Sequence, residues 1–400
     1  MIRFAEAVLP GHPDKFCDRV ADAIVAEALR ADPAAFAQIE VGVWSDQAWL
    51  SGNIVTRQPL TRSPAEILVE TGLSIGLDER NWIDARRYCV TDTVCLNNGD
   101  PTEGRGISDD QCIVIGYAGY DIRTRYFPPE QFLVHSLGDA LWSSCRTGAL
   151  AGCGPDGKLL VTLREEGDAW HLERVLVTLQ HPQTMPLLQL TAGVQQTLQH
   201  AYSGLCEADP RWRSSWPTIE VMVNPNGPHY RGGSDGDNGQ TGRKLVMDYY
   251  GPRVPIGGGA LSGKHPAHID RLAAHAARDA AVKAVASGAH DCLIRLAYAP
   301  NMNEPLEVVW EIGGLGDRVP RSFFDVDQMV ARMDGSPWKT LASTGFWRST
   351  GASDIDNARR MSRQAHPMSL SFENMSTFTP LNLAAPKSSC SNRHTLAPAP

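Results

Sequence analysis

Apolar residues recur at helical spacing in three segments of the chain, residues 13–30, 129–142 and 269–288. In each segment the apolar positions fall three or four residues apart, which places them on one face of a helix. Gly288 suits the C-terminal cap of the third helix. The apolar positions that define the three helices are Phe16, Val20, Ile24 and Ala28; Phe132, Leu133, Leu137 and Leu141; and Ile269, Leu272, Ala276 and Ala280.

Short apolar runs with strand character lie around these helices. Runs of strands with a long helix after some of them indicate an α+β protein rather than an alternating parallel-sheet fold. The long helices begin about 120–140 residues apart, a common domain length. A threefold pseudo-repeat would fit this spacing, although no internal sequence match proves it. The strand-like runs are 35–43, 48–56, 111–118, 159–165, 174–180, 218–224, 292–300 and 306–312.

The length and charge of the chain narrow the class of protein. A chain of 400 residues exceeds the ~250–300 residues at which single cores split, so we expect two or three domains. The hydrophobic fraction of 42% and charged fraction of 20% are ordinary for a folded protein. A net charge of −8 argues against a broad nucleic-acid surface, which would be basic. Clusters of Lys and Arg in this acidic background are therefore informative.

Cysteine usage and hydropathy predict a cytoplasmic protein. The nine cysteines are odd in number and contain no C-x-x-C pair, which favours reduced thiols over disulfides or structural zinc. The first residues do not form a secretory signal, and no run approaches the ~18 apolar residues of a membrane span. From Met368 the chain is rich in Ser, Pro, Asn and Thr, so we expect residues 366–400 to form a mobile tail.

The first candidate for chemistry is the sequence Gly11-His12-Pro13-Asp14-Lys15 at the start of the first helix. Proline suits the first helical position, and the free N–H groups there attract anions. Asp14 would hold magnesium and His12 would reach a phosphate oxygen. In the alternative interpretation, Asp14 only complements the helix dipole and His12 only caps the turn.

Two glycine-rich segments are the other candidates. Residues 232–244 contain five glycines and end in Arg243-Lys244 before the strand-like LVMDYY, which suits close approach to a phosphate. The alternative is a flexible surface turn. Residues 257–264 contain most of a P-loop pattern, but His265 replaces its Ser or Thr, so a P-loop NTPase is improbable. Lys264 would still reach a phosphate, and Asp270 would be a second magnesium carboxylate.

These three motifs, in this order and spacing, resemble the S-adenosylmethionine synthetase family over roughly residues 1–315. Supporting segments are SGNIVT, SDDQCIVIGYA, PDGKLLVTL, the strand end at His181 and VNPNG. The resemblance implies an α+β fold of three similar repeats of mixed sheet and helices. It further implies attack of a thioether sulfur on C5′ of ATP, which expels triphosphate for hydrolysis to phosphate and pyrophosphate. The approximate domains would be 1–105, 106–230, 231–365 and the tail.

The same resemblance assigns roles to individual residues of this chain. The catalytic residues would be His12, Lys158, Arg243 and Lys264. The ATP and triphosphate site would comprise these four residues with Asp237, Lys244 and Gly259. The amino-acid side would comprise Asn53, Asp110, Asp237 and His268. Asp14 and Asp270 would hold Mg²⁺, and Glu40 matches the potassium-linked carboxylate. Two subunits would share the sites, in a homodimer or a dimer of dimers that binds ATP and methionine, with no nucleic acid or membrane partner.

Departures from the family pattern gather on the amino-acid and base side of the site. Asn53 stands where the family has Glu, His268 where it has Lys, and His229 where it has the aromatic that stacks on adenine. The segment that contains residues 95–111 is shorter than its counterpart, and Gly345-Phe346-Trp347 is a remnant of a C-terminal signature. The hypothesis is therefore an adenosyltransferase that uses methionine. The alternatives are transfer to another sulfur or amino-acid acceptor, and a non-catalytic regulatory relative that binds nucleotide.

Overall fold

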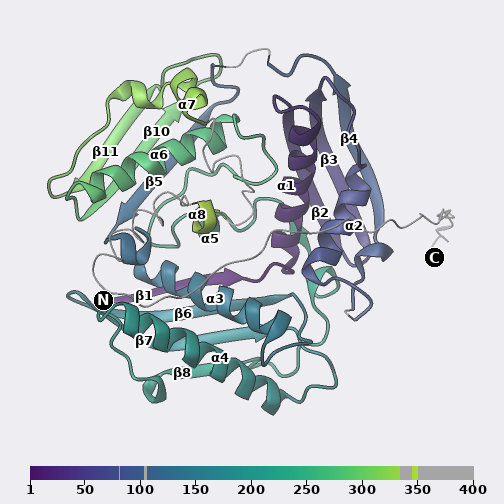
Figure 1. Cartoon of the computed structure of the whole chain (residues 1–400), viewed down its shortest axis with the longest axis vertical. Helices are drawn as coiled ribbons and strands as arrows, with labels where there is room; N and C mark the ends of the chain where they lie inside the picture. Colours follow the sequence, from purple (N-terminus) through teal and green to yellow (C-terminus); the bar gives the residue numbers. More distant parts are fainter. Residues whose placement is uncertain (81, 103–105, 334–344, 350–400) are drawn as a thin grey trace, which may run out of the picture. The chain divides into compact units, whose positions relative to one another are not determined.

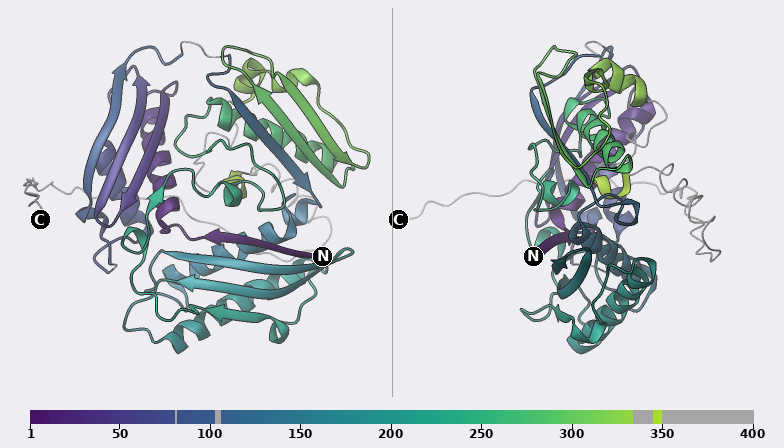
Figure 2. Two further views of the ribbon diagram at one scale, coloured as in Figure 1. Left: turned by 180° about the vertical axis from the view of Figure 1, so that it is seen from behind. Right: turned by 90° about the vertical axis from the view of Figure 1, so that its left-hand side faces the viewer.

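Three sheets, each packed against helices, organise the chain (Figure 1). The computed structural model describes residues 1–80, 82–102, 106–333 and 345–349. These residues belong to one compact unit, Met1–Ile355. The expected tail, residues 366–400, lies outside the described residues. Figure 2 shows the same sheets from two further directions.

The first sheet has the strand order β4-β3-β2-β9. Its strands β2 and β3 are antiparallel, β4 is parallel to β3, and the short β9 pairs antiparallel with β2. Helices α1 and α2 pack against this sheet. The bounds are α1 Pro13–Ala31, β2 Phe36–Trp44, β3 Gln47–Thr56, α2 Pro64–Ile75, β4 Cys89–Asn98 and β9 Gly239–Gln240.

The second sheet has the order β1-β6-β7-β8, with β1, β6 and β7 antiparallel and β8 parallel to β7. Helices α3 and α4 pack against this sheet, with α3 on β1 and β6 and α4 on β8. The bounds are β1 Ile2–Val8, α3 Pro129–Thr147, β6 Gly157–Glu166, β7 Ala169–Leu179, α4 Leu187–Ala208 and β8 Glu220–Val223.

The third sheet has the order β11-β10-β5, entirely antiparallel. Helix α6 packs on β5 and β10, and α7 packs on α6. The bounds are β5 Cys112–Gly119, α6 Ile269–Ala286, β10 Asp291–Tyr298, β11 Glu307–Gly313 and α7 Val326–Met333. Two single turns of helix, α5 Leu245–Asp248 and α8 Phe346–Ser349, lie between the sheets in Figure 1.

The same element order recurs around the three sheets. A long helix, α1, α3 or α6, precedes an antiparallel pair and a second helix, and one strand joins each sheet from a distant part of the chain. Those distant strands are β9, β1 and β5, and each pairs antiparallel with the first strand of its hairpin. The predicted α+β class is therefore confirmed. The predicted division at residues 105, 230 and 365 stays a prediction.

The three predicted helices form, but the sequence analysis did not predict several other elements, among them helices α2, α4 and α7 and strand β9. Helix α2 begins with a capping box in which Ser63 and Glu66 bond each other's backbone N–H groups, a signal present in the sequence. Helix α4 buries Leu190, Val194 and Leu198 at every fourth position. Strands β1 and β4 were also missed. The residues after Lys244 were expected to continue as a strand, and that was wrong, because Leu245–Asp248 forms a helical turn.

The hydrophobic core divides into two clusters of buried residues. One lies between α1, α2 and the first sheet. The other cluster comprises buried residues of the second and third sheets and of the helices that pack on them, and it includes Phe346 and Trp347. Within the described part of the chain, no helix is both long and apolar enough to span a membrane.

Candidate active site

The N-terminus of α1 carries the first group of predicted site residues. His12 is the N-cap residue, and its Nδ1 accepts a hydrogen bond from the backbone N–H of Asp14 at 3.3 Å. Burial lowers the pKa of His12, with a further lowering from the Lys244 ammonium, while Asp156, Asp14 and Asp237 act in the opposite direction. The capping role considered from the sequence is therefore confirmed. It leaves Nε2 as the ring atom that can face a ligand.

Asp14 is the centre of this group, and besides the neighbouring His12 it contacts residues of the distant segment 240–244. Its Oδ2 accepts a hydrogen bond from Lys244 Nζ at 2.5 Å, and its Oδ1 lies 3.5 Å from Arg243 Nη1. Oδ1 also accepts the backbone N–H of Gln240 at 2.9 Å. The carboxylate is buried, whereas the Arg243 side chain is 45% exposed. We call His12, Asp14, Asp237, Arg243 and Lys244 the α1 cluster.

The N-terminus of α6 carries a second group with the same construction. His268 is the N-cap residue, and its Nδ1 accepts the backbone N–H of Asp270 at 3.2 Å. Lys264 Nζ donates to Asp270 Oδ2 at 2.5 Å. Gly259 packs so closely on the Asp270 carboxylate that any side chain at 259 would collide with it. We call Gly259, Lys264, His268 and Asp270 the α6 cluster.

A cavity of about 490 Å³ opens beside the α6 cluster. Asp270 and the glycines at 257–259 form one wall, and residues of β5 and β10 form the rest. The glycine loop therefore presents only backbone to this space, and α6 contributes the carboxylate of Asp270. Burial lowers the pKa of His268, so its imidazole is neutral at pH 7 and does not replace the positive charge of a lysine.

At the start of α3, the corresponding acidic residue is fully paired with an arginine. Glu130, the second residue of α3, corresponds in position to Asp14 and Asp270. Arg253 donates to both of its carboxylate oxygens, at 2.9 and 2.7 Å. Such a two-pronged pair satisfies both partners. The single-pronged lysine contacts of Asp14 and Asp270 leave more room for exchange with a ligand.

Strand β2 aligns the two glycine-rich segments along one edge. β9 pairs with Gly42 and Val43, while Lys264 forms an isolated bridge with Gln38. Glu40 lies between these two points on the same strand. Although its side chain reaches solvent, surrounding protein raises the pKa of Glu40, and the Lys264 ammonium acts in the opposite direction. The potassium-linked carboxylate expected at this position thus lies beside the α6 cluster.

The remaining predicted site residues have other contacts. Lys158 on β6 is half-exposed and pairs with Glu6 at 2.7 Å. Asn53 on β3 accepts a hydrogen bond from Asn97 Nδ2 at 2.6 Å. The Asp110 carboxylate accepts the backbone N–H of Gln111 at 2.7 Å. None of these contacts joins either cluster.

Sequence reasoning missed the neighbouring Asp109. Its Oδ1 accepts the backbone N–H of Ile269 at 3.0 Å, and its Oδ2 lies 3.6 Å from His265 Nε2. Asp109 therefore anchors the start of α6 from a segment far away in the chain. Two adjacent aspartates in SDDQ were visible, but only the fold decides which of them reaches the helix.

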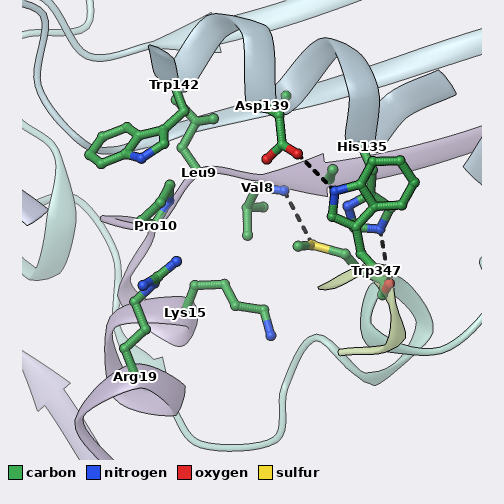
Figure 3. A pocket seen from close by; sticks show the side chains of 12 residues that line it. Val8, Leu9, Pro10, Lys15, Arg19, His135, Asp139, Trp142 and Trp347 are labelled. Atoms are coloured by element: carbon green, nitrogen blue, oxygen red, sulfur yellow. Dashed lines mark hydrogen bonds between the residues drawn. The ribbon is translucent and has the colours of Figure 1, made fainter. Parts of the chain in front are cut away.

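A separate pocket of about 180 Å³ lies between α1 and α3 (Figure 3). Lys15 and Arg19 enter it from α1, and His135, Asp139 and Trp142 enter it from α3. Trp347, part of the predicted C-terminal remnant, donates through Nε1 to Asp139 Oδ2 at 2.9 Å. Its ring also stacks on His135. Among the residues that the structure describes around this pocket, none has a role assigned from the sequence resemblance.

Asp14 and Asp270 are carboxylates of the two clusters that could take part in holding a metal ion. Within the described ranges, no group of three or more His, Cys, Asp or Glu side chains could hold a metal ion. Asp14 and Asp270 each offer one carboxylate beside a lysine. Magnesium in phosphate-binding sites typically takes only one or two carboxylates, with phosphate oxygens and water as its other ligands.

Comparisons with known proteins show the family to which the chain is similar. Residues 1–95 match the model of the S-adenosylmethionine synthetase N-terminal domain, and residues 231–331 match that of the C-terminal domain. An S-adenosylmethionine synthase of Rhodospirillum centenum is 33% identical over 78% of this chain and 80% of its own. S-adenosylmethionine synthase 2 of Rhodospirillum rubrum is 35% identical over the same shares. An S-adenosylmethionine synthase of Paracoccus denitrificans is 32% identical over 83% and 85%.

Proposed function

The chain belongs to the S-adenosylmethionine synthetase family, and we propose that it forms S-adenosylmethionine from ATP and methionine. The observation that carries the proposal is the meeting of Arg243 and Lys244 with Asp14 at the start of α1. A helix N-terminus, two cations and a carboxylate together suit a triphosphate with magnesium. Lys264 and Asp270 repeat this combination at the start of α6.

The proposed reaction uses these groups to stabilise the leaving group. The methionine sulfur attacks C5′ of ATP, the C5′–O bond breaks, and triphosphate departs with the bonding electrons. Arg243, Lys244 and Lys264 would contact the oxygens on which negative charge accumulates. Such preorganised cations commonly contribute a factor of ~10²–10³ each to turnover. Hydrolysis of the triphosphate then releases phosphate and pyrophosphate.

Magnesium would be held by Asp14 and Asp270, and potassium by Glu40. Bound metal would neutralise further charge on the departing triphosphate. Asp14 would have to release Lys244, and Asp270 would have to release Lys264, so that each lysine can turn towards phosphate. The short contacts of these pairs describe the resting arrangement of the cations. The neutral His12 would then donate through Nε2 to a phosphate oxygen.

A homodimer is the proposed assembly, in which clusters of two subunits complete each site. Each sheet exposes large apolar side chains, among them Phe4 at 57%, Trp49 at 46% and Ile113 at 60% exposure. Apolar exposure on all three sheets supports a broad contact between copies. The eight cysteines in the described ranges carry free thiols, which supports a reducing compartment such as the cytoplasm.

A second candidate function is transfer of the adenosyl group to another acceptor. The observation that favours it is the neutral contact of Asn53 with Asn97, where an acceptor ammonium would otherwise meet a carboxylate. Replacing a carboxylate by an amide there would remove a charge-assisted contact worth roughly 1.5–3 kcal/mol. Binding of methionine to the complex with a non-hydrolysable ATP analogue, measured by titration calorimetry, separates the two functions.

The decisive experiment is incubation with ATP, Mg²⁺, K⁺ and methionine, followed by mass spectrometry and phosphate analysis. S-adenosylmethionine with equal amounts of phosphate and pyrophosphate is the expected result. Cleavage of added tripolyphosphate without an adenosyl product would favour the second candidate. If neither activity occurs, while ATP still binds, the chain is a regulatory relative and the proposal is wrong.

A further inference from the structure

Three aspartates lie at every fourth position of α1, namely Asp14, Asp18 and Asp22. This spacing places them on one face of the helix, about 6 Å apart along its axis. All three are buried, and Asp18 and Asp22 have 0% and 2% exposure. Buried carboxylates are costly unless they are paired or hydrogen-bonded, so the contacts of this row indicate its purpose.

Each aspartate accepts a backbone N–H from a glycine-rich segment. Asp14 Oδ1 accepts from Gln240, Asp18 Oδ1 from Gly242 and Asp22 Oδ1 from Gly263, each at 2.9 Å. These partners are more than 200 residues away, with separations of 226, 224 and 241. One helix face therefore holds both of the segments that carry the proposed phosphate-binding cations.

The bonded glycines stand directly before those cations. Gly242 precedes Arg243-Lys244, with φ of 75°, and Gly263 precedes Lys264, with φ of 78°. Both conformations favour glycine. Because each anchored amide belongs to the residue directly before a cationic residue, displacement of the amide would also displace the cation.

Asp18 and Asp22 each also interact with a buried cationic side chain. Lys15, which Figure 3 shows extending from α1, donates to Asp18 Oδ2 at 2.8 Å and also pairs with Asp248. Arg271 is attracted to Asp22, and its Nη1 donates to the carbonyl of Lys264 at 2.9 Å. Lys264 is thus held before its amide by Asp22 and at its carbonyl by Arg271.

We propose that Asp18 and Asp22 are positioning residues, which set the places of Arg243-Lys244 and Lys264 through the backbone of Gly242 and Gly263. Neither carboxylate contacts substrate in this role. Asp18 acts on the α1 cluster and Asp22 acts on the α6 cluster, so that a single helix face sets the spacing of both. The consequence for turnover rests on the proposed function, whereas the hydrogen bonds themselves do not.

Hydrogen exchange of the full-length, ligand-free protein tests the anchoring. In Asp22→Ala, peptides covering residues 261–266 should exchange at least about tenfold faster, because a hydrogen bond to a charged group is lost. Peptides covering 239–244 should stay at wild-type rates, and Asp18→Ala should show the reverse. Asp18→Asn and Asp22→Asn keep an oxygen acceptor, so their exchange should remain within about threefold of the wild type.

Glu27→Gln is the matched control. Glu27 is a buried acid of the same helix, but it binds Arg30, Arg62 and the backbone of residues 61–62. Its substitution should lower the melting temperature without changing exchange in either glycine-rich segment. Uniform acceleration across the whole protein in Asp18→Ala and Asp22→Ala, or wild-type exchange in their target segments, would overturn the inference.

Turnover then tests the consequence. In the S-adenosylmethionine assay, Asp22→Ala should lower kcat/KM for ATP at least about tenfold, and Asp22→Asn should recover most of this loss. Glu27→Gln should leave it unchanged. Selective exchange together with an inactive wild-type protein would overturn the proposed function alone. Selective exchange together with unchanged kcat/KM in both alanine variants of an active enzyme would overturn the positioning role.

Discussion

Replacement of Lys264 by methionine separates the catalytic use of this residue from its part in stability. Lys264 and Asp270 are 8% and 9% exposed and meet at 2.5 Å. Removal of one partner from a fully buried pair costs ~3–5 kcal/mol. Since Asp270 also lines an open cavity, we expect a smaller loss of about 1–3 kcal/mol in the free energy of unfolding, or roughly 1–2 °C in Tm for each kcal/mol in a unit of this size.

Turnover should fall much further than stability. Loss of one preorganised cation should lower kcat about 10²–10³-fold, measured as S-adenosylmethionine formation and as tripolyphosphate hydrolysis. The double variant Lys264→Met with Asp270→Asn removes both charges, so its Tm should return most of the way to the wild-type value. Its turnover should stay low. The reasoning fails if Lys264→Met keeps more than about a tenth of the wild-type kcat, or if the double variant regains activity.

Three further predictions concern other parts of the chain. Gly263→Ala should lower Tm and turnover together, because φ of 78° strains alanine and its methyl group would collide with a backbone carbonyl of β2. Thermal unfolding and the synthetase assay check this prediction, and wild-type values in both would contradict it. Asn53→Glu should tighten methionine binding to the ATP-analogue complex about tenfold or more, as measured by calorimetry, and unchanged affinity would show that this side chain does not meet the ammonium. Burial lowers the pKa of His135 to about 4 and that of His275 to about 3. As the pH falls, these histidines are therefore protonated first in the unfolded chain, where their pKa is about 6.5. The free energy of unfolding should decrease between pH 6.5 and 4 by up to about 1.4 kcal/mol per pH unit for each histidine. Unfolding followed across this range should show a slope that is one proton smaller in His275→Leu, and an unchanged slope would refute the assignment.

Local sequence was sufficient where neighbouring residues determine the outcome. The apolar spacing of residues 13–30, 129–142 and 269–288 predicted α1, α3 and α6, because the buried face of a helix is visible in its periodicity; the longer α4 was missed. The motif of His12 and Asp14 likewise predicted a helix start with a capping residue and an acidic residue in the first turn, and the structure has both. The glycines before Arg243 and Lys264 indicated a backbone conformation that favours glycine, and both have positive φ in the structure.

Only the tertiary structure decided which of these local features meet. The pairing of Asp14 with Lys244, the anchoring of Gly263 by Asp22 and the choice of Asp109 to hold the start of α6 all join residues from distant segments. Strand exchange among the three sheets creates these meetings, since β9, β1 and β5 each join a sheet far from their own place in the chain. Periodicity specifies which face of an element is buried, but not which other element buries it. That choice comes from packing all the elements at once, and the site follows from it.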